Sequence, residues 1–159
     1  MAVEQSSKAL ELQPDRCLAA EVLTWAYIGK GDHVAAAASF ENFLMLDGQP
    51  SRVIRFRRAY ETSGLRSAIL DWLNLPQDYL GKCATSLVIR AGWFAWCGES
   101  DKAFKWLQRG LETQEPFIFF IGAHPAFDNL RDDPRFDRFL RRMKAAHTNP
   151  RPLSGGSNP

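Results

Sequence analysis

The chain has 159 residues, of which 45% are hydrophobic and 24% charged, and its 20 basic and 18 acidic side chains give a formal net charge of +2. This length suits one domain with a real core, and the composition excludes an intrinsically disordered protein. The small net charge does not by itself imply a polyanionic partner. No apolar run is long enough to span a bilayer, and the chain begins without the features of a signal peptide. We therefore expect a soluble, cytoplasmic protein.

The first part of the chain shows helical periodicity in three consecutive segments. Apolar residues spaced three and four apart predict helices over 2–12, 17–29 and 34–46. Pro14 ends the first helix because proline cannot continue it, and Asp15 is a candidate N-cap for the second. The short links between these segments favour antiparallel neighbours, because a single amphipathic helix buries too little apolar surface to offset its ordering entropy.

Glycines separate the helices that follow. Gly64 and Gly98 each lie between two helix-like segments, where a residue that accepts positive φ can end a helix and turn the chain. Pro76 opens the longest of these segments. Few runs alternate with a period of two, so no strand is predicted. The predicted helices here run over 52–63, 65–74, 77–97 and 101–113.

Small residues recur at a nearly constant spacing. Three glycines between helices are 33 and 34 residues apart, at Gly31, Gly64 and Gly98. Four alanines in similar contexts follow at steps of 34, 32 and 35 residues, at Ala2, Ala36, Ala68 and Ala103. A fixed period of this length indicates a repeat architecture in which each helical hairpin stacks on the next.

One stretch carries a family resemblance. Leu23-Thr24-Trp25-Ala26-Tyr27, followed by Gly31-Asp32, Ala36 and Phe40, resembles a tetratricopeptide repeat, and Ala9-Leu10-Glu11-Leu12-Gln13-Pro14 resembles the end of a preceding one. The frame returns as Leu87, Phe94, Gly98, Ala103 and Leu107, whereas the middle unit, 50–76, is degenerate and has Arg57 where leucine is usual. The resemblance covers residues 2–116. It implies an all-α protein, an α-α superhelix of antiparallel helix hairpins.

The C-terminal part contains a shorter echo, which we expect to form a capping segment over 117–147. His124-Pro125-Ala126-Phe127-Asp128 is followed by Asp133-Pro134-Arg135-Phe136-Asp137, and in both a capping residue precedes proline at the first helical position. A one-turn helix over 125–130 and a final helix over 134–146 are predicted. The final helix should bury Phe136, Phe139, Leu140 and Met143 and expose Arg135, Arg138 and Arg142. The pairing resembles the end of bacterial multidomain signalling proteins with C-terminal tetratricopeptide arrays.

The remaining segments give three further expectations. The apolar tract 116–121 should be a buried connection, and residues 148–159, rich in Pro, Gly, Ser and Asn, should form a disordered tail. Ala2 starts inside what would be the second helix of a hairpin, which leaves an apolar face on 2–12 uncovered. The favoured interpretation is a C-terminal excerpt of a longer regulator whose N-terminal domain is missing; the alternative is self-association.

No motif predicts catalysis, a metal or a cofactor. The three histidines, His33, His124 and His147, lack the spacing of metal ligands, and Gly29-Lys30-Gly31-Asp32 lacks the frame of a phosphate-binding loop. An enzyme that uses His124, Asp128 and Asp137 is a weakly supported hypothesis. The three cysteines are odd in number and widely spaced, and we expect them to be core thiols of a reducing cytosol: Cys17, Cys83 and Cys97.

The family resemblance implies a concave groove, lined by the first helix of each hairpin, that binds peptides. Exposed Trp and Arg there would be typical interface anchors, although each side chain could equally be a core or an ordinary surface residue. The expected function is a non-catalytic scaffold whose partner is a protein or peptide, a second copy of the chain, or the missing domain. Transferred by frame, the groove candidates are Glu21, Trp25, Ile28, Ile54, Arg58, Glu61, Val88, Gly92 and Trp96.

Nucleic-acid binding is the alternative function, through two arginine-rich segments. Nearby Glu61, Asp71, Asp128 and Asp137 dilute the positive charge, which favours a solvated, salt-linked surface. The first cluster comprises Arg52, Arg55, Arg57 and Arg58, and the second Arg131, Arg135, Arg138, Arg141, Arg142 and Lys144.

Overall fold

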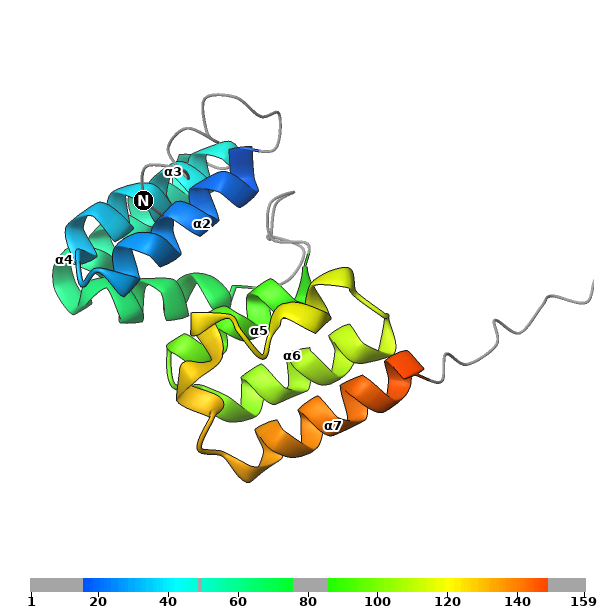
Figure 1. The fold of residues 1–159 in the computed structure, drawn as a ribbon. Helices are drawn as coiled ribbons and strands as arrows, with labels where there is room; N and C mark the ends of the chain where they lie inside the picture. The colour runs from blue at the N-terminus through cyan, green and yellow to red at the C-terminus, as the bar shows by residue number, and fades with distance from the viewer. Residues whose placement is uncertain (1–15, 49, 76–85, 149–159) are drawn as a thin grey trace, which may run out of the picture.

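The computed structural model of the protein describes residues 16–48, 50–75 and 86–148 (Figure 1). Every regular element in these ranges is helical, which confirms the predicted all-α class. The predicted helix over 2–12 and residues 149–159 of the predicted tail lie outside the described residues. The α-helices are α2 (Arg16–Gly29), α3 (His33–Leu46), α4 (Pro50–Leu73), α5 (Leu87–Trp96), α6 (Ser100–Glu112) and α7 (Pro134–Thr148), and two short 3₁₀-helices are η3 (Pro116–Phe120) and η4 (Pro125–Leu130).

Helices α2 and α3 form a tightly packed hairpin. Gly31 turns the chain with a φ of 73°, and the Asp32 carboxylate then accepts a hydrogen bond from the Ala35 N–H at 3.0 Å, which caps α3. Ala20 and Ala36 are fully buried. Their small side chains let the two backbones approach closely. The Ser39 hydroxyl donates to the Ala20 carbonyl at 3.0 Å and fixes the register of the pair.

Helix α4 is two helical segments joined at Gly64. This glycine has φ 79° and ψ 175°, a conformation that is open essentially only to glycine. The predicted helices over 52–63 and 65–74, with a break between them, therefore describe α4 well. The second segment buries Ala68, Ile69 and Trp72, which places them in the core that α3 and α4 share with α5.

Helix α5 begins at Leu87, so the predicted helix running unbroken through 77–97 is wrong at Ser86. Ser86 has an extended conformation, and its hydroxyl oxygen accepts a hydrogen bond from the Ile89 N–H at 3.3 Å. The Glu115 carboxylate, beyond α6, accepts from the N–H of Leu87 at 2.8 Å, from the N–H of Val88 at 3.3 Å and from the Ser86 hydroxyl at 2.8 Å. A distant carboxylate therefore defines where α5 starts.

Replacing Glu115 with alanine is expected to lower the free energy of unfolding by about 2 kcal/mol, because two N–H groups and a hydroxyl at the start of α5 lose their acceptor. Urea denaturation followed by circular dichroism measures this change. The matched control is Glu112→Ala, whose carboxylate accepts from Gln108 on the exposed face of α6 and should change stability by less than about 0.5 kcal/mol. Equal losses in the two variants would contradict the assigned cap.

The segment between α6 and α7 is only partly buried. Ile118 and Ile121 are each 1% exposed, as a buried connection requires, but Phe117, Phe119 and Phe120 are 42%, 49% and 65% exposed. The prediction that this tract is buried is therefore wrong for its three phenylalanines. The tract forms the 3₁₀-helix η3, in which residues three apart share a face, so the two isoleucines face the core and the phenylalanines cannot all join them.

Helix α7 closes the described chain, and its faces are as predicted. Phe136, Phe139 and Met143 are buried and Leu140 is partly buried against the core. The arginines on its other face are exposed: Arg135, Arg138 and Arg142.

The cysteines differ from expectation. Cys17 is disulfide-bonded, so the prediction of three reduced core thiols is wrong at this position. Sequence spacing does not show which cysteines meet in a fold, and cysteine usage no longer argues for a reducing compartment. Cys97 is a free thiol, and burial raises its pKa to about 12.

Among the described helices, none combines the length and hydropathy that a membrane span requires.

Candidate functional site

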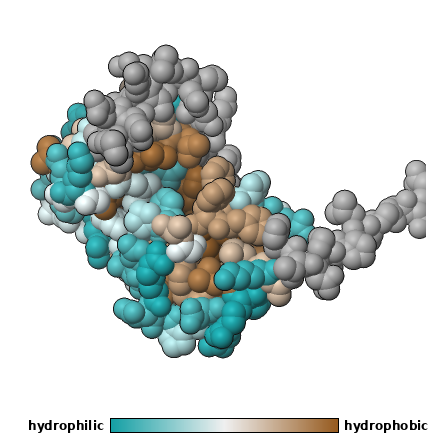
Figure 2. All heavy atoms as spheres, in the orientation of Figure 1, coloured by the Kyte–Doolittle hydropathy of each residue, from teal (hydrophilic) through white to brown (hydrophobic). Residues whose placement is uncertain are grey.

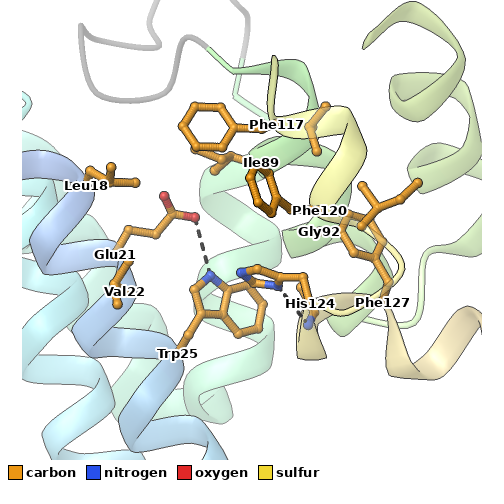
Figure 3. A pocket seen from close by; sticks show the side chains of 13 residues that line it. Leu18, Glu21, Val22, Trp25, Ile89, Gly92, Phe117, Phe120, His124 and Phe127 are labelled. Atoms are coloured by element: carbon orange, nitrogen blue, oxygen red, sulfur yellow. Dashed lines mark hydrogen bonds between the residues drawn. The ribbon is translucent and has the colours of Figure 1, made fainter. Parts of the chain in front are cut away.

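A cavity of about 320 Å³ lies between α2, α5 and the segment that contains η3 and η4 (Figure 3). Its wall is apolar apart from Glu21 and His124. Aromatic rings form much of it, and Figure 3 shows side chains of α2 directed toward those of η3 and η4 across the space. The aromatic members of the wall are Trp25, Phe117, Phe120, His124 and Phe127.

Helical spacing places the α2 and α5 residues in this wall. Leu18, Val22 and Trp25 are four and three residues apart and therefore lie along one face of α2. Val88 and Gly92 are likewise four apart on α5. Gly92 lets η4 approach α5 closely, because an added Cβ would lie 3.0 Å from the Ala126 Cβ.

Glu21 is the one carboxylate in the cavity wall. Its side chain is buried, and its Oε1 accepts a hydrogen bond from the Trp25 indole N–H at 3.3 Å. Burial raises the pKa of Glu21 to about 7, and the indole N–H groups of Trp25 and Trp93 oppose part of that rise. The Trp93 indole N–H favours the charged form of Glu21, although it forms no hydrogen bond of good geometry to a described residue. Glu21 therefore titrates near neutral pH.

His124 lies on the opposite side of the cavity from α2. Its Nδ1 accepts a hydrogen bond from the Ala126 N–H at 3.1 Å, which caps η4 and leaves the proton of the neutral ring on Nε2. The ring packs edge-on against Trp25, with centroids 5.6 Å apart. Burial lowers the pKa of His124, and Asp128 opposes that shift. Burial therefore favours the neutral form of the His124 ring.

The structure brings together four of the predicted groove residues. Glu21, Trp25, Val88 and Gly92 all line the cavity. Trp96 packs beside the cavity. Its ring is edge-on to those of Trp25 and Trp93, with centroids 6.2 Å apart in both pairs, and the Arg66 guanidinium lies over it.

The other predicted groove residues do not line this cavity. Ile54, Arg58 and Glu61 are exposed on α4, and Ile54 is 56% exposed. Ile28 is partly buried against the core. The frame of the resembled family thus places residues of α2 and α5 in the site, but not those of α4.

Sequence reasoning missed the part of the cavity that comes from η3 and η4. The sequence predicts a buried connection for Phe117 and Phe120, and it predicts a helix cap or, in the enzyme hypothesis, a catalytic residue for His124. The spacing of Ile118 and Ile121 could have shown that the phenylalanines are exposed. Residues three apart lie on one face of a 3₁₀-helix, and the face that carries the two isoleucines cannot also accommodate the phenylalanines.

Several arginines of both clusters form ion pairs with nearby carboxylates. Arg55 pairs with Asp71 and Arg57 with Glu41, each at 2.6 Å. Arg52 pairs with the buried Asp47 at 3.1 Å. These pairs reduce the positive charge that α4 offers to a polyanion.

The second cluster is similar. Arg131 pairs with Asp128 at 2.7 Å, and Arg135 pairs with Asp101 at 2.6 Å and with Asp133 at 2.7 Å. Arg138 and Arg142 line a more polar hollow between α6 and α7.

Of the three residues in the enzyme hypothesis, only His124 lines the apolar cavity, since neither Asp128 nor Asp137 does.

No metal site accompanies the cavity: in the described part of the chain, no three His, Cys, Asp or Glu side chains gather as a metal ion would need. The chain matches no protein-family model, and its comparison with curated proteins and with solved structures gives no match either.

Proposed function

We propose that the protein is a non-catalytic, tetratricopeptide-like interaction module that binds a segment of another protein at the cavity between α2, α5 and η3–η4. The observation that carries this proposal is the cavity itself, whose apolar wall continues onto exposed hydrophobic side chains at its rim. The two hairpins beside it, α2–α3 and α5–α6, each turn at a glycine with positive φ, Gly31 and Gly98, which supports the family resemblance.

The rim of the cavity exposes large hydrophobic side chains. Val22 is 46% exposed and Phe120 is 65% exposed, and Leu18 and Phe117 are also exposed. Figure 2 shows hydrophobic residues gathered on this face, over α2 and η3. Contiguous apolar surface with a polar surround is typical of protein-interaction sites. Such a rim is broader than a small molecule in the cavity would cover.

The size of the cavity indicates how a partner would bind. At about 320 Å³ it is at the small end of the range for ligand sites, so it suits one inserted side chain. The rim then contacts the residues on either side of that side chain. This division into one buried anchor and a surrounding contact zone is the arrangement in which a few residues supply most binding energy.

Site-specific photo-cross-linking in the cells that express the protein tests this proposal. A benzophenone side chain replaces Phe120 in one variant and Val22 in another, and the same group at the exposed Ala38 on α3 is the control. We expect cross-links from positions 120 and 22 to one shared segment of another protein, mapped by mass spectrometry, and none to that segment from position 38. Cross-links only to the same chain, or equal cross-linking from all three positions, would contradict the proposal.

A further inference from the structure

We infer that the cavity recognises an organic ammonium group and that, within the proposed interaction, it takes the side chain of a lysine of the partner protein. This inference rests on the proposed function. It concerns the chemistry of the inserted side chain rather than the existence of the interface.

The first ground is the carboxylate of Glu21, which is only 5% exposed and lies in an otherwise apolar part of the wall. Within the described ranges, one of its oxygens accepts a single hydrogen bond, from Trp25, and no Lys or Arg forms an ion pair with it. A buried carboxylate is costly unless a cation and hydrogen-bond donors satisfy it. An ammonium group supplies three donors and the missing positive charge.

The second ground is the aromatic wall that faces Glu21. Trp25 extends from the same helix, while Phe117, Phe120 and Phe127 contribute rings from the opposite side (Figure 3). Aromatic faces attract cations, and the attraction strengthens when the cation is removed from water. The apolar surfaces also suit the four methylene groups of a lysine stem, which pack on such surfaces while the ammonium group reaches a polar partner.

The third ground concerns the other charges around the cavity. Glu21 and His124 are its titratable wall residues, and Asp128 is the acidic group that acts on His124. Burial lowers the pKa of His124 and so favours its neutral form, which does not repel a cation. An ammonium group beside Glu21 would in turn favour the ionised carboxylate.

The rim identifies the source of the ammonium group. A free amine would occupy the cavity but leave Phe120 and Val22, 65% and 46% exposed, uncovered. A lysine carried by a polypeptide places its side chain in the cavity and its neighbouring residues over Phe120 and Val22. The structure therefore favours a protein-borne lysine over a small free amine.

Isothermal titration calorimetry with three probes tests the inference. Nα-acetyl-L-lysine methylamide carries the ammonium group, Nα-acetyl-L-norleucine methylamide is its neutral counterpart, and n-butylammonium is the free amine. We expect the lysine probe to bind at least about tenfold more tightly than either of the others, since charge-assisted hydrogen bonds and rim contacts add to the apolar contribution. Titration near pH 6 in two buffers of different ionisation enthalpy should also show proton release on binding.

Two variants complete the design. Glu21→Gln should weaken the lysine probe about tenfold and leave the norleucine probe unchanged, and the exposed Glu112→Gln should alter neither. Equal binding of lysine and norleucine probes, or no effect of Glu21→Gln in a folded protein, overturns ammonium recognition while the cross-linked interface stands. Failure of all three probes to bind also overturns it. Equal binding of n-butylammonium and the lysine probe overturns the assignment to a protein-borne lysine.

Discussion

Replacing Trp93 with alanine is expected to lower the free energy of unfolding by about 3–5 kcal/mol, the largest change that we predict for a single residue. Trp93 is fully buried, stacks on Trp25 with centroids 3.9 Å apart and meets Phe40 edge-on at 5.3 Å. It therefore joins α2, α3 and α5 in one core. Its removal leaves a cavity beneath the floor of the candidate site, and a domain of ordinary stability loses a large fraction of its stability.

Urea denaturation followed by circular dichroism measures this loss. Trp93→Phe keeps an aromatic ring and removes an indole N–H that has no hydrogen-bond partner among the described residues, so it should cost much less than the alanine variant. Phe117→Ala, at a side chain that is 42% exposed, is the surface control and should change stability by less than about 1 kcal/mol. A Trp93→Ala protein as stable as the control would show that the packing of α2 on α5 is misassigned.

Replacing Glu21 with glutamine is expected to remove a pH dependence of stability. Burial raises the pKa of Glu21 from 4.5 to about 7 in the folded protein. The folded state therefore binds more protons than the unfolded state between these values. The resulting stabilisation is complete below about pH 4.5 and is lost as the pH rises through 7; a shift of this size corresponds to about 3 kcal/mol.

The measurement is the free energy of unfolding of the wild type minus that of Glu21→Gln, from about pH 5 to about pH 8. We expect this difference to fall as the pH rises and to level off above about pH 7, where Glu21 is ionised in both the folded and the unfolded state. His124 acts in the opposite sense, because its lowered pKa makes stability increase with pH, but it is present in both proteins and cancels in the difference. A difference that does not vary with pH would mean that the Glu21 carboxyl is not buried in the folded protein.

The helices and their turns were largely predictable because their signals are local. Gly31, Gly64 and Gly98 have φ angles of 73°, 79° and 87°, so each glycine in the repeat does adopt the positive φ that its position suggested. The predicted helices over 17–29 and 34–46 differ from α2 and α3 by one residue at most. Apolar periodicity and a residue that accepts positive φ are sufficient to place such elements.

The features that escaped prediction depend on contacts between distant residues. Helix α5 starts after Ser86 because Glu115 reaches its N-terminus from 28 residues along the chain from Leu87. Glu21 lies on a helix whose sequence looks like an ordinary groove face. Its burial depends on packing against other parts of the chain, including Trp93 of α5, whose indole acts on the Glu21 carboxyl. Phe117 and Phe120 are exposed because Ile118 and Ile121 already occupy the core-facing side of the same turn.

The candidate site was therefore predictable only in part. The frame of the resembled family identified Glu21, Trp25 and Val88, which do line one cavity. It could not identify the opposing wall, because that wall comes from the segment after α6, outside the repeat pattern. A carboxylate on one wall and aromatic rings on the other form a candidate site only when both are placed in space.

The most direct test of lysine recognition is to locate the lysine probe by intermolecular nuclear Overhauser effects in an isotope-labelled protein. With Nα-acetyl-L-lysine methylamide at saturation, we expect contacts from the probe's terminal methylene groups to the Trp25 indole and to the methyl groups of Val22 and Ile89, all of which line the cavity. Contacts only to Phe104 and Phe139, in the hollow between α6 and α7, would contradict it.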